Sequence, residues 1–161
     1  MRTILIIFSL FIAPLVRQCA AAQDTLKFYV VSDEPVPGGR YIDTAECPKV
    51  GYIGNTPNLV VRHLQAVSTN TYQVFSQYNG KVSVQTNAAI VIQMAAADET
   101  RFAGLTRENV GRCILISLGD RPLMAPRVQT PIKTGDFQIS LADGRGAEAT
   151  LAALKKFVRD K

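Results

Sequence analysis

Apolar and polar residues alternate most clearly in the middle of the chain, on either side of Asn79-Gly80. Residues 72–77 and 81–86 favour two strands, and Asn-Gly supplies the positive φ angles that a tight turn between them needs. The pattern therefore predicts a β-hairpin. Residues 88–95, AAIVIQMA, are apolar at almost every position, which is typical of a central strand buried on both faces.

A helix is expected after this strand, with Asp98 as its N-cap and Gly111 as its left-handed stop. Pro126 cannot donate to a strand ladder, so the strand that contains it is expected at a sheet edge or at a bulge. A closing helix is expected over residues 147–158, where apolar residues recur at spacings of three and four. The other strands are predicted at residues 26–31, 59–67, 113–118, 121–128 and 137–140.

This order of elements predicts an α+β fold, a mainly antiparallel sheet with two helices packed on one face. An irregular N-terminal arm is expected before it, because prolines and glycines recur between residues 35 and 57. We therefore predict an N-terminal strand and arm over residues 23–57 and the α+β domain over residues 58–161.

Residues 1–22 have the pattern of a secretory signal peptide. One arginine precedes a short apolar run, and Ala20, Ala21 and Ala22 form an A-x-A site that predicts cleavage before Gln23. Membrane crossing needs about 20 apolar residues, and no stretch after Ala22 is that long. The mature chain is therefore predicted to be periplasmic or secreted, with no transmembrane segment; lipidation at Cys19 is the alternative.

Cys47 and Cys113 remain after cleavage. Exported chains meet oxidising conditions, in which an even number of cysteines usually pairs. We therefore predict a disulfide between them. The alternative is a buried thiol at Cys113, inside an apolar strand.

The residues that carry chemistry form no catalytic pattern. His63 is the single histidine, which is too few for a zinc site. A serine or cysteine nucleophile would need His63 as its base, and no nucleophile motif accompanies it, so we expect His63 to be a partly exposed strand residue. Residues 143–146, DGRG, could present amides to an anion, but they lack the lysine and hydroxyl residue of a phosphate loop. The net charge of +5 is scattered along the chain, which disfavours a nucleic-acid partner. We expect no enzyme activity, no metal and no cofactor.

The segments TRENVGR, ILISLGD, MAP and PIKTG follow one another from residue 106 to residue 135. In this order and spacing, the chain over about residues 88–158 resembles the head portion of the first periplasmic domain of SecD-type protein-export subunits. It departs from the family in carrying none of its transmembrane helices and in the sequence of residues 141–146. The resemblance implies a head-like fold that contacts unfolded or emerging polypeptide. The motif residues are Thr106, Asn109, Gly111, Asp120, Ala125, Pro126, Ile132 and Gly135.

The leading hypothesis is an exported, non-enzymatic module that binds a polypeptide or an envelope partner protein. The expected contact elements are the proline-interrupted edge at residues 121–128 and the loop at residues 131–136, because a free sheet edge can accept an added strand. One alternative is a small-molecule-binding or enzymatic domain with its site in the 35–56 loop region. A structural envelope protein is a further alternative. The residues expected to converge in the site of the first alternative are Tyr41, Asp43, Glu46 and Tyr52.

Overall fold

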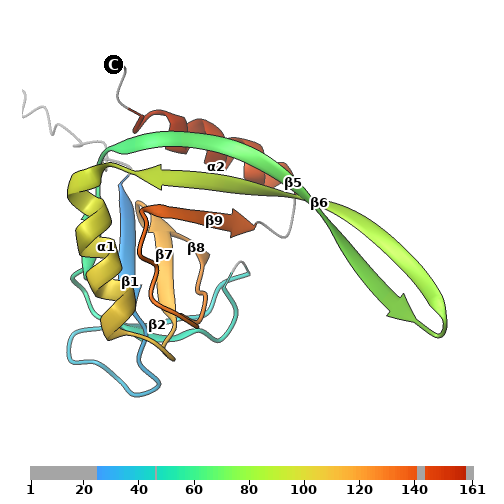
Figure 1. Cartoon of the computed structure of the whole chain (residues 1–161). Coiled ribbons are helices and arrows are strands. Elements are labelled where there is room, and N and C mark those ends of the chain that lie inside the picture. The colour runs from blue at the N-terminus through green and yellow to red at the C-terminus, as the bar shows by residue number, and fades with distance from the viewer. Residues whose placement is uncertain (1–24, 46, 141–143, 159–161) are drawn as a thin grey trace, which may run out of the picture.

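The computed structural model describes residues 25–45, 47–140 and 144–158, and its strands form three sheets (Figure 1). The four-stranded sheet has the order β4-β1-β7-β8, the three-stranded sheet the order β5-β6-β9, and β2 pairs with β3. All the pairings between these strands are antiparallel. The strands are β1 (Leu26–Val30), β2 (Arg40–Ile42), β3 (Gly51–Ile53), β4 (Leu59–Val61), β5 (Leu64–Tyr78), β6 (Lys81–Met94), β7 (Ile114–Leu118), β8 (Arg121–Met124) and β9 (Asp136–Ser140).

Strand β1 lies inside the four-stranded sheet, between β4 and β7. Its register aligns Leu26 with Val61 on one side and with Leu118 on the other. Central strands need apolar side chains because both sides and at least one face are covered, and the LKFYV sequence of β1 meets that need. The predicted strand near the N-terminus is therefore confirmed, and it is part of the core.

The predicted hairpin is confirmed, and its strands are much longer than the alternation indicated. Asn79 and Gly80 have φ angles of +48° and +73°, the left-handed values that a tight two-residue turn requires. The apolar run predicted as a separate strand continues β6 without a break. In contrast, the single strand expected over residues 59–67 is divided into β4 and β5 at Arg62 and His63.

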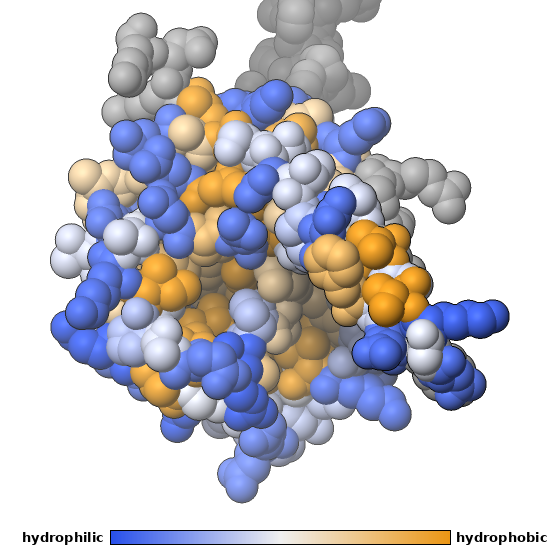
Figure 2. Space-filling view, turned by 45° about the vertical axis from the view of Figure 1, so that its right-hand side comes forward, coloured by the Kyte–Doolittle hydropathy of each residue, from blue (hydrophilic) through white to orange (hydrophobic). Residues whose placement is uncertain are grey.

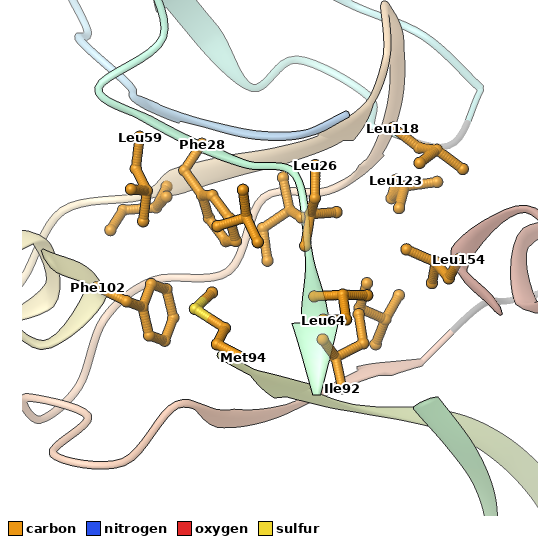
Figure 3. Close-up of a cluster of buried hydrophobic side chains, with 14 of the residues drawn as sticks. Leu26, Phe28, Leu59, Leu64, Ile92, Met94, Phe102, Leu118, Leu123 and Leu154 are labelled. Carbon is orange, nitrogen blue, oxygen red and sulfur yellow. The ribbon is translucent and has the colours of Figure 1, made fainter. Parts of the chain in front are cut away.

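The main hydrophobic core lies between the four-stranded and three-stranded sheets (Figure 3). Helix α1 (Ala96–Glu108) contributes Phe102 at one end of the cluster, and helix α2 (Gly144–Lys155) contributes Leu154 at the other. The N-cap of α1 is Ala95, so the expected cap at Asp98 is wrong. Asp98 lies in the first turn instead, where it pairs with Arg101 at 3.0 Å and complements the helix dipole.

The α+β class, with mainly antiparallel strands and two helices, is confirmed. Two details differ. The strands divide between three sheets, and the two helices, expected on one face, lie at opposite ends of the core. The stretch between β1 and β4 is mostly irregular, as expected, apart from the β2–β3 pair. A second, smaller cluster joins that stretch to the main sheet through Tyr29, Val31, Ile42, Cys47, Ile53 and Leu115.

Candidate functional site

An apolar cleft of about 300 Å³ opens between the edge of the four-stranded sheet and the edge of the three-stranded sheet. One wall is β8 with the chain that follows it, and the other is the loop before β9 with the start of β9. Figure 2 shows that the molecule is hollowed, with apolar side chains inside the hollow. The residues that line the apolar cleft are Phe28, Phe102, Thr106, Ile114, Ile116, Met124, Pro126, Val128, Ile132, Asp136, Phe137 and Gln138.

Three phenylalanine rings form a cluster at the apolar cleft. The centroid of Phe28 lies 5.2 Å from that of Phe102 and 5.8 Å from that of Phe137, and the last two are 5.3 Å apart. These tilted and edge-on arrangements are the ones that aromatic rings prefer. Phe28 and Phe102 are buried and Phe137 is half-buried, so the cluster provides a rigid apolar surface that reaches the cleft.

Both walls of the apolar cleft belong to outer strands, because β8 and β9 each end the order of their sheet. After β8, Ile114 N–H donates to Pro126 C=O at 3.0 Å, and Val128 N–H donates to Arg112 C=O at 2.9 Å. Backbone groups of successive residues in an antiparallel strand point to alternate sides. The N–H and C=O of Arg127 are therefore directed outward, away from the sheet.

A hydrogen-bonded threonine holds the loop wall of the apolar cleft in place. Thr106, on α1, is buried, and its hydroxyl oxygen accepts the N–H of Ile132 at 3.0 Å. The same hydroxyl lies 3.2 Å from the C=O of Ala103 and 3.4 Å from that of Ile132, either of which can accept its proton. Two predicted motif residues, Thr106 and Ile132, are thus in direct contact.

Other motif residues shape the turns around the apolar cleft. Asn109 Nδ2 donates to Leu105 C=O at 2.8 Å, and Gly111, at φ +83°, donates its N–H to Val128 C=O at 2.8 Å. Gly135 accepts a hydrogen bond from Met94 N–H at 3.1 Å. A Cβ atom on Gly135 would lie 3.0 Å from the Met94 Cβ, so a side chain there would push the loop away from β6.

Asp120 lies in the turn between β7 and β8, and its carboxylate accepts a hydrogen bond from Lys27 Nζ at 3.0 Å. This hydrogen bond and the positive charge of Lys27 lower the pKa of Asp120 below its ordinary value. The carboxylate is well exposed, so we assign the pair a role in the β1–β7–β8 turn and none in the apolar cleft.

The motif prediction located part of the apolar cleft. Thr106, Pro126 and Ile132 line it, whereas Ala125 faces a different cavity. Sequence reasoning missed the aromatic cluster, because a phenylalanine in a strand or helix gives the same pattern whether it is in the core or at the rim of a cleft. The missing signal is tertiary: Phe28, Phe102 and Phe137 lie on three elements that meet only after folding.

A second, more polar cavity of about 800 Å³ is lined by residues of the N-terminal stretch and of the chain around Gly111–Cys113. Tyr41, Asp43 and Tyr52, expected to converge in a pocket, do not line it. Tyr41 and Tyr52 stack edge-on with centroids 5.0 Å apart, and the Asp43 carboxylate accepts the N–H of Lys49. Glu46 lies outside the described residues. The charged residues that line the polar cavity are Asp33, Glu34, Lys49, Arg112 and Arg127.

Cys47 is a buried member of the second hydrophobic cluster, and the half-buried Cys113 packs against the same cluster. No disulfide joins them in the structure. Both residues belong to one small cluster although they are distant in sequence, and the pairing stays a prediction.

The described part of the chain contains no group of three or more His, Cys, Asp and Glu side chains arranged to hold a metal ion. His63 is exposed, between β4 and β5. Within the described ranges, neither helix has the length and apolar character needed to cross a membrane.

The chain is similar to known protein-export components. It is 29% identical over 91 residues to the protein translocase subunit SecD of Acidaminococcus fermentans, covering 56% of this chain and 22% of that protein. A solved structure described as a membrane component, SecDF, that enhances protein export matches 82% of this chain and 62% of the other at a TM-score of 0.53 and 18% identity. SecDF in its super-membrane-facing form matches 83% of this chain and 19% of the other, with a TM-score of 0.53 and 19% identity.

The structural matches show a shared fold, and the chain spans about a fifth of the length of the SecD relative. The family model of the SecDF P1 head subdomain matches residues 51–155. This match includes the walls of the apolar cleft and the motif residues from Thr106 to Gly135, and it begins well before the region in which the sequence motifs were found. The chain therefore belongs to the SecDF P1 head subdomain family.

Proposed function

We propose that this protein is a non-enzymatic module of protein translocation that binds extended, apolar segments of polypeptide in the apolar cleft. The observation that carries this function is an apolar cavity flanked by two outer strands, β8 and β9. An extended peptide could pair with one of these edges, because an outer strand has backbone groups without a strand partner. One of its large apolar side chains would then enter the cleft.

The size of the apolar cleft suits a single large side chain. A cavity of about 300 Å³ is at the small end of ligand sites in proteins. Burial of one Leu or Phe side chain contributes roughly 1.5–3 kcal/mol, and backbone pairing adds affinity that does not depend on sequence. Such a site favours weak, broad recognition of unfolded segments.

Peptide titration tests this function. Fluorescence anisotropy would follow a labelled, permanently unfolded peptide with spaced leucines and phenylalanines as the protein is added. We expect saturable binding that weakens about tenfold in Met124→Gln, since Met124 is half-buried at the cleft wall and a tenfold change corresponds to about 1.4 kcal/mol. Met124→Leu should bind like the wild type.

Two controls distinguish binding in the apolar cleft from non-specific hydrophobic binding. Val110→Gln changes an exposed apolar residue outside the cleft and should leave the affinity unchanged. A peptide that is N-methylated at every residue should lose binding, because neither of its edges then has an N–H group to donate to a strand. Absence of saturable binding, or equal loss in Met124→Gln and Val110→Gln, would show that the cleft is not the site.

The proposed location is outside the cytoplasm. Residues 1–22, whose sequence has the signal-peptide pattern, lie outside the described residues, and we propose that they are removed on export. The protein secreted by an export-competent host should begin at Gln23 when its N-terminus is sequenced. Recovery of the uncleaved chain from the cytoplasm would contradict this location.

A second candidate function is favoured by the polar cavity. Its volume of about 800 Å³ is in the range of small-molecule sites, and its charged residues have both signs. A thermal-shift screen of amino acids, dipeptides and sugar phosphates tests it, with Arg112→Ala expected to remove any stabilisation by a bound ligand. A screen without a stabilising ligand would leave polypeptide binding as the better function.

A further inference from the structure

The β5–β6 hairpin extends beyond the rest of the molecule as a two-stranded ribbon (Figure 1). We call residues 71–88 the ribbon, from the Thr71–Ala88 pair to the Tyr78–Lys81 pair. Strand β9 pairs with β6 only over residues 89–93, so in the ribbon each strand has one neighbour. Both edges of the ribbon are therefore free in the described structure.

The ribbon also exposes apolar side chains. Opposite residues of an antiparallel pair share a face, so the Phe75–Val84 and Gln77–Val82 pairs place Phe75, Val82 and Val84 on the same face. Their exposed fractions are 67%, 64% and 52%, and Figure 2 shows apolar side chains gathered where the hairpin comes forward. A two-stranded hairpin is only marginally stable by itself in water, so this segment gains from a partner.

The distribution of charged residues indicates what kind of partner the ribbon can pair with. Strand β5 contains no charged residue over its 15 positions, and between Lys81 and Asp98 there is none either. Proteins usually protect free edges with charges, prolines or bulges. The only irregularity of β5 is at Leu64 and Ala66, at the end far from the ribbon.

We propose that β5 pairs antiparallel with β5 of a second copy of this chain, forming a dimer with twofold symmetry. A twofold axis brings the same strand of both copies together, so charges of one sign on that strand would repel each other. The uncharged β5 avoids this repulsion at every register. The two ribbons then form one four-stranded sheet on which both copies of Phe75 lie on the same face.

The oligomeric state of the purified protein tests this dimer. Light scattering coupled to size exclusion, over a range of micromolar concentrations, is expected to give twice the chain mass. The double variants Gln73→Glu/Gln77→Glu and Gln73→Lys/Gln77→Lys place like charges on the shared sheet at exposed positions. Each variant should be a monomer, and an equimolar mixture of the two should return to the dimer mass.

The matched control Gln129→Glu/Thr130→Glu adds the same charge at exposed positions outside the ribbon and should remain dimeric. Circular dichroism confirms that every variant is folded. A monomeric wild type at all concentrations, or a dimer that persists in both charge variants, overturns the proposal. Binding of an unfolded peptide along β5 of a monomer would also overturn the proposal, because the edge would then pair with a bound polypeptide and not with a second copy. None of these results depends on the apolar cleft.

Discussion

The two halves of the β5–β6 hairpin have the same strand pairing and opposite surroundings. Near the body, Ile90, Ile92 and Met94 are buried between the two large sheets. In the ribbon, Phe75 and Val84 are directly paired and exposed. The comparison shows that an apolar strand pair acts as core where other elements cover it and as a potential interface where they do not.

The largest expected difference between the two halves is the cost of truncating an apolar side chain. Ile92→Ala should lower the free energy of unfolding by about 2–5 kcal/mol, because it leaves a cavity in the core. Val84→Ala, matched in strand and chemistry, should change it by less than about 0.5 kcal/mol in monomeric protein. Urea denaturation of both variants measures this, and similar costs would mean that the ribbon is covered in the monomer.

A disulfide between Cys47 and Cys113, which we propose for the exported protein, should stabilise the body and leave the ribbon unchanged. Oxidised protein is expected to be about 2–4 kcal/mol more stable than reduced protein, and Cys113→Ser should remove the difference. Amide exchange in the ribbon should be the same in both states. Alkylation of both thiols in the unreduced exported protein, detected by mass spectrometry, would contradict the pairing.

Replacing a threonine by valine should also lower stability more in the body than in the ribbon, but by a smaller amount than the isoleucine and valine truncations. Thr106→Val removes the acceptor of the Ile132 N–H, and an unpaired buried donor costs about 1–3 kcal/mol. Thr71→Val, at an exposed position of the ribbon, should be nearly neutral. Thermal unfolding compares the two variants; a neutral Thr106→Val would show that the loop wall of the apolar cleft is held by other contacts.

The smallest effect is expected at the surface pair of Lys27 and Asp120. Because the pKa of Asp120 is lowered in the folded protein, the pair stabilises the fold above the ordinary aspartate pKa of about 3.9. This contribution is lost as the pH falls through the lowered value. NMR titration of the carboxyl carbon should show the shift, and Lys27→Met should return the pKa to its ordinary range. An unchanged titration in Lys27→Met would assign the shift to another cause.

The sequence correctly predicted the features that depend on residues close together along the chain. The Asn79-Gly80 turn and the edge position of the Pro126 segment follow from backbone constraints within a few residues. Gly111 has the predicted left-handed conformation, but α1 ends at Glu108 with Asn109 as its C-cap, so Gly111 lies in the turn after the helix. The start of α1 was predicted three residues late, because Asp98 is a good cap residue and the preceding alanines are good helix formers. Local propensity alone does not choose between these two starts.

For the candidate site, the motif located Thr106, Pro126 and Ile132 and did not locate the three phenylalanines. The motif is a contiguous run of turns that can be followed along the chain. The three phenylalanines belong to β1, α1 and β9, which are distant along the chain. They come into contact only when the two sheets pack together.

The strand and helix types, the hairpin turn and the family motif were predictable from the amino-acid sequence, because each depends on the chemistry of neighbouring residues. Packing of distant elements determines that β8 and β9 flank an apolar cleft and that half of the β5–β6 hairpin is left uncovered. These two features could not be predicted, because alternation specifies which side chains share a face, whereas burial of that face depends on elements that are distant along the chain.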